Sequence, residues 1–252
     1  MPQVHAPLNT LIGVVLLAVM STGVLWWYGV PQRWAPLWAI ARGLVQLSVL
    51  SLILSGVIEN GLLVALGVAA MFAVAVLTAA RRLGAGRRRW SVMLTVAGAM
   101  GAGVGAVLLI VFGTGTLELS SRYVLALAGI IVGNAMNSVT LTGRRLNEAI
   151  RDRWSEVEGW LALGATPRQA TVSMARQAVH HAMIPATDQA KTTGLVTLPG
   201  AFVGAIFGGL SPVEAGRFQI IVLASILAAG AMASVATAYA MSPVKTKPLP
   251  AG

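Results

Sequence analysis

Runs of about 20 apolar residues recur along this chain, with short polar connections between them. A helix of that length crosses the hydrocarbon core of a bilayer, which is about 30 Å thick, because each residue adds about 1.5 Å. Such runs lie at residues 8–28, 38–58, 61–80, 91–113, 123–142, 192–210 and 215–241. The sequence therefore predicts an all-α integral membrane protein with about seven transmembrane helices, in a single domain over residues 1–252.

The composition supports lipid as the solvent for most of the surface. Only 10% of the residues are charged and 56% are hydrophobic, whereas a soluble domain carries about 25% charged residues. The net charge of +10 is spread over short clusters between apolar runs, so it does not form the continuous basic face that nucleic acid requires. We therefore expect membrane lipid as a partner and no nucleic acid. Cysteine is absent, which excludes disulfides and thiolate metal ligands.

Basic residues also predict the orientation, because cytoplasmic connections retain Lys and Arg. With the N-terminus outside and the C-terminus inside, 16 of the 18 basic residues are cytoplasmic and only Arg122 and Arg217 are external. Residues 1–10 lack the basic stretch that begins a cleavable signal, so we expect the first run to be kept as a helix. We predict a multi-pass protein of the cell (inner) membrane.

The one long polar stretch between spans, residues 143–191, is predicted to be a cytoplasmic helical segment. Apolar residues recur in it at helical spacing, at Leu146, Ile150, Trp154, Val157 and Leu161. Gly164 is expected to end this helix, because glycine tolerates the left-handed conformation of a C-terminus.

A second helix is predicted to begin at Thr166, where Thr-Pro-Arg-Gln forms a capping box with proline at the first helical position. We expect it to run to about Met183 and to end at Pro185. Two such helices could be a DNA-reading helix-turn-helix, a rigid elbow that passes conformational change to a cytosolic partner, or a purely structural hairpin. Tethering between two spans favours the elbow.

The motif Glu158-Gly-Trp-Leu-Ala-Leu-Gly164-Ala-Thr-Pro-Arg168-Gln169 resembles the coupling segment of ABC permeases. Together with Gly133-Asn134-Ala-Met-Asn137-Ser and Lys191-Thr-Thr-Gly194-Leu-Val-Thr-Leu-Pro199-Gly200, it resembles the FetB-like ABC transporter permease family. That family includes a bacterial iron-export permease and plant proteins linked to aluminium tolerance. The resemblance extends from Arg42-Gly-Leu-Val-Gln46 to Phe218-Gln219.

The resemblance implies a permease that works as a homodimer with two copies of a separate ABC ATPase and that exports a metal ion such as iron. It also implies which residues contact the ATPase, and these are Glu158, Gly164, Ala165, Thr166 and Arg168. The chain departs from the family after Pro199-Gly200, where relatives carry Met-Met and Gln and this sequence has Ala201-Phe202-Val203.

No nucleotide-binding motif G-x-x-x-x-G-K-[S/T] occurs in the chain. We therefore expect no ATPase activity and no cofactor in this chain, with ATP bound by the partner subunit. A membrane-embedded enzyme would need a nucleophile with a base or an H-E-x-x-H cluster, and neither is visible. A carrier or scaffold without an ATPase, and a permease for a small organic solute, remain as alternatives.

Polar residues inside spans are costly in lipid, so they predict a translocation path. In the fifth span these are Asn134, Asn137 and Ser138, and in the second span Arg42 and Gln46 share one face. Hydrogen bonding between helices, or extension of Arg42 to the headgroups, would explain them equally.

Pro199 and Gly200 are expected to break the sixth span and to line the path with free carbonyls. Residues that could ligate a metal are few, and the adjacent His180 and His181 point about 100° apart on a helix. The metal ligands therefore stay unknown.

Overall fold

The structure is a computed structural model that describes residues 7–57, 60–84 and 89–248. These ranges hold nine α-helices and no strand, with one isolated bridge between Thr193 and Thr197. The chain divides into two compact units, Met1–Asn60 and Gly61–Gly252. Each unit is described by itself.

The first unit is a pair of helices, α1 (Pro7–Trp27) and α2 (Ala35–Val57), which pack against each other. Many of their apolar side chains are exposed, among them Leu16, Leu17 and Leu47. Such a surface needs lipid or another protein to cover it. The predicted end of the second span at Ile58 lies outside the described residues.

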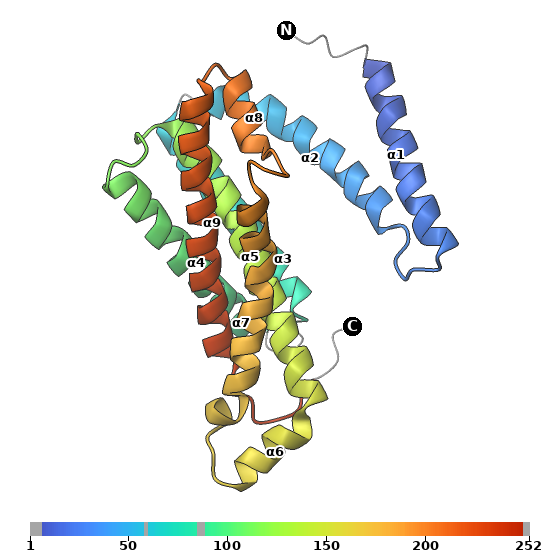
Figure 1. Ribbon diagram of the computed structural model, residues 1–252, viewed down its shortest axis with the longest axis vertical. Helices are drawn as coiled ribbons and strands as arrows, with labels where there is room; N and C mark the ends of the chain where they lie inside the picture. The colour runs from blue at the N-terminus through green and yellow to red at the C-terminus, as the bar shows by residue number, and fades with distance from the viewer. Residues whose placement is uncertain (1–6, 58–59, 85–88, 249–252) are drawn as a thin grey trace. The chain divides into compact units, whose positions relative to one another are not determined.

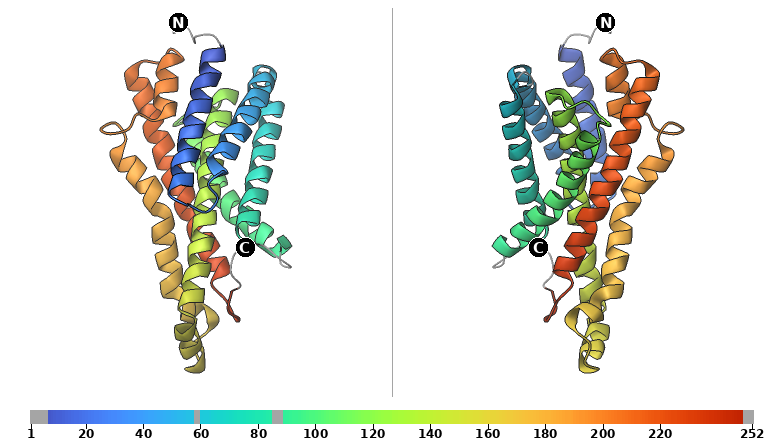
Figure 2. Two further views of the ribbon diagram at one scale, coloured as in Figure 1. Left: turned by 90° about the vertical axis from the view of Figure 1, so that its right-hand side faces the viewer. Right: turned by 90° about the vertical axis from the view of Figure 1, so that its left-hand side faces the viewer.

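The second unit is a bundle around α5 (Ser121–Asp152), the longest of the described helices. This helix packs against α3 (Gly61–Arg82), α4 (Arg89–Gly113), α7 (Pro167–Thr192) and α9 (Pro212–Met241). Figure 1 and Figure 2 show α5, α7 and α9 side by side, with α6 (Trp154–Ala162) at one end of the bundle and α8 (Gly200–Phe207) at the other.

Small residues allow these helices to approach closely. The core of the second unit is built from alanine and valine with a few larger side chains such as Met100, Leu127 and Ile131. At Gly103 on α4, a Cβ atom would lie 2.7 Å from the backbone oxygen of Ala229 on α9. The two backbones are therefore in direct contact at this point, as small residues permit in membrane bundles.

Five helices in the described residues are long and apolar enough to cross a membrane, and they are α1, α3, α4, α5 and α9. A shorter apolar stretch, Ala35–Ser51, lies in α2. The prediction of an all-α membrane protein is confirmed. The number of seven crossings and the orientation stay predictions.

The sixth predicted span, residues 192–210, is not a single helix. α7 ends at Thr192, a hydrogen-bonded turn follows, and α8 begins only at Gly200 with Pro199 as its N-cap. The turn forms because Gly194 has a φ of +86° and the Thr192 carbonyl accepts from the backbone N–H groups of Val196 and Thr197. The expected break near Pro199 and Gly200 is therefore present, and it occupies seven residues.

The predicted helix end at Pro185 is wrong, because α7 continues through Pro185 to Thr192. A proline inside a helix removes one hydrogen bond, here the bond to the carbonyl four residues earlier, and neighbouring helices make that loss tolerable in membrane bundles.

The predicted first cytoplasmic helix is also divided. Residues 143–152 belong to α5, the helix interrupts at Arg153, and α6 begins at Trp154.

Candidate functional site

A pocket of about 310 Å³ lies in the second unit and is lined by residues of α3, α5 and α7. It contains three of the residues that the sequence predicted for a translocation path, Asn134, Asn137 and Ser138 on α5. The rest of the lining comes from all three helices, namely Arg82, Thr140, Leu141, Arg144, Ala182, Pro185, Ala186 and Gln189.

The polar groups of α5 in this pocket are only partly used by the protein itself. The Asn134 Nδ2 atom donates to the Ile130 carbonyl at 2.9 Å, and the Thr140 hydroxyl donates to the Met136 carbonyl at 2.7 Å. Ser138 is buried, and Asn137 is exposed with no side-chain hydrogen bond to the described residues. The amide groups of Asn134 and Asn137 therefore keep hydrogen-bonding capacity for a ligand.

Two arginines stand at one end of the pocket. Arg82 closes the last turn of α3, and Arg144 extends from α5 so that its Nε atom donates to the Arg82 carbonyl at 3.1 Å. This bond satisfies one of the free carbonyls at the end of α3. It also holds the two guanidinium-bearing residues on adjacent helices at the same level of the bundle.

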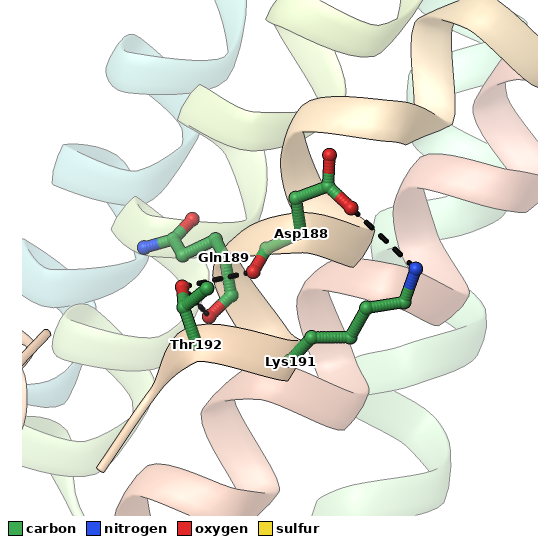
Figure 3. A network of polar contacts seen from close by, with 4 residues as sticks. All are labelled: Asp188, Gln189, Lys191 and Thr192. Atoms are coloured by element: carbon green, nitrogen blue, oxygen red, sulfur yellow. Dashed lines mark hydrogen bonds and ion pairs between the residues drawn. The ribbon is translucent and has the colours of Figure 1, made fainter. Parts of the chain in front are cut away.

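Gln189 brings the third amide to the pocket, from the last turns of α7. Figure 3 shows its side chain pointing away from the Asp188–Lys191 ion pair, which measures 3.5 Å. The Thr192 hydroxyl donates to the Asp188 carbonyl at 2.9 Å and so closes the end of the helix. The acidic and basic side chains of this turn therefore neutralise each other on a different side from Gln189.

Two other predicted path residues of the second unit do not line the pocket. Pro199 and Gly200 lie at the start of α8 and are absent from its lining. Arg42 and Gln46 are exposed on α2 in the first unit, and their role stays a prediction.

The elbow, which we define as α6, the turn 163–166 and the first turns of α7, has the local geometry that the sequence predicted. Gly164 adopts a φ of +88°. Thr166 caps α7, since its hydroxyl accepts from the Gln169 N–H and the Gln169 side chain accepts from the Thr166 N–H at 2.8 Å. The turn is therefore fixed by one glycine and one capping box.

A separate apolar cluster joins the elbow to the bundle. Leu146, Ile150 and Val157 of the predicted stripe are fully buried in it, and Trp154 and Leu161 pack against it. Met174 and Ala178 of α7 complete the cluster, so α5, α6 and α7 form one packed body at this end.

The predicted coupling residues divide into two groups. Glu158 is exposed on α6, and the exposed fractions of Trp160 and Leu163 are 51% and 82%. Arg168 instead contacts α9, because its guanidinium lies 3.7 Å from the centre of the Tyr239 ring and donates to the Tyr239 carbonyl at 3.3 Å. The exposed surface of α6 and of the turn after it thus carries one carboxylate and two large apolar side chains.

Comparison with known proteins identifies the family of this chain. The family described as "Uncharacterised protein family (UPF0014)" matches residues 8–244. The chain belongs to the UPF0014 family. No solved structure matches it.

Three relatives of this UPF0014 protein carry informative names. "UPF0014 membrane protein STAR2" of Oryza sativa subsp. japonica is 35% identical over 208 residues, which cover 81% of this chain and 71% of STAR2. "Protein ALUMINUM SENSITIVE 3" of Arabidopsis thaliana is 34% identical and covers 81% of this chain and 74% of its own. "Probable iron export permease protein FetB" of Escherichia coli (strain K12) is 36% identical over 141 residues, 56% of this chain and 54% of FetB. The resemblance inferred from the motifs is confirmed.

Sequence reasoning missed several residues of the two sites in this UPF0014 chain. Arg144 had a signal, because positions 134, 137, 141 and 144 recur at steps of three, four and three and so share one face of α5. Arg82 and Gln189 had none, since only tertiary packing brings α3 and α7 to this face. Trp160 and Leu163 lie inside the coupling motif, but the periodicity did not reveal their exposure.

A resident metal centre is not visible in the ranges that the structure describes. Within residues 7–57, 60–84 and 89–248, no group of three or more His, Asp or Glu side chains is placed to hold a metal ion. His180 and His181 have ring centres 5.6 Å apart with planes tilted by 55°.

Proposed function

We propose that this chain is the transmembrane permease subunit of an ABC transporter, driven by a separate ATPase subunit that binds ATP. One observation carries the proposal, and it is that the pocket and the elbow share the same two helices. α5 and α7 line the pocket at one level and contribute to the elbow cluster at another.

The connection between pocket and elbow is direct. α5 runs without interruption from Asn137 to Asp152, a length of roughly 22 Å at 1.5 Å per residue. α7 runs from Pro167 to Gln189 over roughly 33 Å. Because the buried cluster joins these helices to α6, a displacement of the elbow moves two walls of the pocket together.

The outer surface of the elbow suits a protein partner. Trp160 and Leu163 expose apolar side chains on the same short helix and turn that expose Glu158, and large exposed apolar side chains on a surface that also carries charge are typical of an interaction site. We assign this surface to the ATPase and keep Gly164, Ala165 and Thr166 as the residues that shape it.

The topology that goes with this function has seven crossings, with the N-terminus outside and the C-terminus inside. The sixth crossing is then the broken one, formed by the end of α7, the turn 193–199 and α8. Broken helices recur in transporters near the path of the cargo. We place the protein in the cell (inner) membrane as a homodimer with two ATPase copies.

The proposed cargo is a metal ion such as iron, moved outward. Its support is the likeness to the probable iron export permease FetB, and the polar side chains of Asn134, Asn137 and Ser138 in the pocket offer a path through the bundle. A second candidate is a small organic solute, and the observation that favours it is the pair of arginines in the lining.

The docking test reverses one exposed charge. Glu158→Lys is expected to reduce copurification of the ATPase and to lower substrate-stimulated ATP hydrolysis, because it reverses an exposed charge on the surface assigned to the contact. The matched control is Glu148→Lys, which reverses an exposed charge on α5 that pairs with Arg145 at 3.2 Å. Equal copurification in both variants and in the unmodified protein would refute the docking site.

The cargo test uses cells that overproduce this chain with its ATPase. Under excess iron, such cells are expected to accumulate less iron than cells with the vector alone, and Asn134→Leu is expected to remove the difference at equal protein level. If no metal changes in content on overproduction of the unmodified protein, metal export is excluded.

A further inference from the structure

The lining of the pocket is positively charged. Its lining contains two guanidinium groups, three side-chain amides and two hydroxyls, and no carboxylate or imidazole. Metal cations that prefer oxygen ligands are held by carboxylates, and softer ones by imidazole or sulfur. The lining therefore has the wrong charge for a bare cation.

Acidic groups on the surrounding helices do not offset these arginines. In the described part of the chain, Glu148 pairs with Arg145, Asp152 with Arg151, Glu156 with Arg153 and Asp188 with Lys191. Neither Arg82 nor Arg144 has a carboxylate within ion-pair distance among the described residues. Their positive charge is thus available to a ligand.

Arg144 is held in place for such a role. Its Nε atom is fixed by the Arg82 carbonyl at 3.1 Å. This bond leaves both terminal nitrogens of the guanidinium as donors, and a guanidinium presents these donors in a planar fork that matches carboxylate and phosphate oxygens. The bond between α5 and α3 also keeps the two arginines together.

The amides extend this set of donors along the pocket. Asn137 and Gln189 have no side-chain hydrogen bond to the described residues, and both line the cavity from facing helices, α5 and α7. Each amide NH₂ group donates two hydrogen bonds. These amides therefore add neutral donors to the lining of the same cavity.

We propose that this pocket binds an anion, a small molecule with carboxylate or phosphate oxygens, through Arg82 and Arg144, with the amides of the lining as additional donors. Its role as the cargo rests on the proposed transport function, whereas the binding itself does not. If the cargo is a metal, the pocket takes it as an anionic complex in which organic oxygens cover the ion. The same chemistry would accept the phosphate of a lipid headgroup, and the experiment separates these sources.

The test measures binding to the purified chain without an ATPase, in nanodiscs of phosphatidylcholine. Citrate, ferric citrate, inorganic phosphate and ferrous ion are titrated separately and followed calorimetrically. Arg144→Gln and Arg82→Gln remove one charge each and keep hydrogen-bonding capacity. The control is Arg145→Gln, which removes the neighbouring charge outside the pocket lining.

Saturable binding of citrate, ferric citrate or phosphate is expected, weakened about tenfold or more by either pocket substitution and unchanged by the control. A second preparation in phosphatidylglycerol nanodiscs identifies a lipid source. If a lipid phosphate occupies the site, native mass spectrometry is expected to detect phosphatidylglycerol bound to the unmodified protein and to the control. This bound lipid is then lost in the two pocket variants only. That result also supports an anion site.

Two results would overturn the proposal. The first is that the unmodified protein, the pocket variants and the control all bind the anions equally, or all fail to bind them, and that the pocket variants lose no bound lipid relative to the control. The other is binding of ferrous ion alone that persists or strengthens in Arg144→Gln. Because no ATPase is present in these measurements, failure of the docking test leaves their interpretation unchanged.

Discussion

Gly164 shows how one residue determines the shape of the elbow. Its φ of +88° lies in the left-handed region that side chains with a Cβ atom rarely adopt, and no atom stands within 4 Å of the position a Cβ would take. Strain from any substitution there is consequently backbone strain and not a clash. The neighbouring Gly159 is a helical glycine with equally open surroundings.

These two glycines give a matched pair of substitutions. Gly164→Ala is expected to destabilise the elbow by about 1–2 kcal/mol. Gly159→Ala is expected to have no such cost and to favour α6 by up to about 1 kcal/mol, because alanine is the better helix former. Thermal unfolding of the purified protein, with limited proteolysis at the turn, measures both. Equal loss of stability in the two variants would contradict the role of the left-handed backbone.

Single residues also show what the sequence could reveal. The capping box at Thr166 and the glycine two residues before it are local signals, so both were predictable from the chain. The alignment of Asn134 with Arg144 was predictable from helical spacing alone. The meeting of Arg82 with Arg144 was not, because it depends on how two distant helices pack.

Among the helices, the close approach of α4 and α9 depends on Gly103. The small-residue spacing of Gly101 with Gly105 suggests these two positions for the contact, yet a Cβ at Gly105 would have nothing within 4 Å. Spacing identifies a face of a helix, but only the structure shows which glycine on the helix touches backbone. The difference gives a second matched pair.

Gly103→Ala is expected to lower the melting temperature, since its Cβ would lie 2.7 Å from the Ala229 oxygen and the two backbones would have to separate. A loss of about 1–3 kcal/mol is usual for overpacking of this kind. Gly105→Ala should leave the melting temperature unchanged or slightly raised. The melting temperatures of the two variants are compared by thermal unfolding in the same detergent and with the same spectroscopic signal. An equal decrease in melting temperature would argue against the contact between α4 and α9.

The helix through Pro185, and the start of the break at Thr192 and not at Pro199, were not predictable in the same way. Proline and glycine mark both sites in the sequence, and the rules for soluble helices place the end at the first proline. In the protein, α7 packs against both α5 and α9, so the loss of one hydrogen bond is tolerated. The chain turns instead at Gly194, where the backbone has a positive φ.

For the molecule as a whole, the orientation in the membrane is predicted from the distribution of basic residues between the two sides. Arg87 and Arg88, which contribute to the predicted cytoplasmic charge, lie outside the described residues. The connection between α4 and α5 and the surface of α6 are described and exposed. Because the chain has no cysteine, single cysteines at these places give an unambiguous signal.

With the N-terminus outside, Thr116→Cys is expected to react with a membrane-impermeant thiol reagent applied to intact cells. Ser155→Cys on α6 is expected to react only after the membrane is permeabilised. After labelling in cells, each variant is purified and its labelled fraction is measured by gel shift. The cysteine-free parent protein is the negative control. The reverse pattern would exclude the proposed orientation.

The first turns of α7 are joined by a hydrogen bond to residues that follow α9 and lie far away in the sequence. The Thr171 hydroxyl donates to the Ser242 carbonyl at 2.8 Å, and Val244 packs against the elbow cluster. Ribosomes make a chain from its N-terminus, and the parts made first fold first. The elbow therefore lacks these contacts until Ser242 and Val244 have been synthesised, so a nascent chain that ends before them would offer the proposed ATPase an incomplete surface.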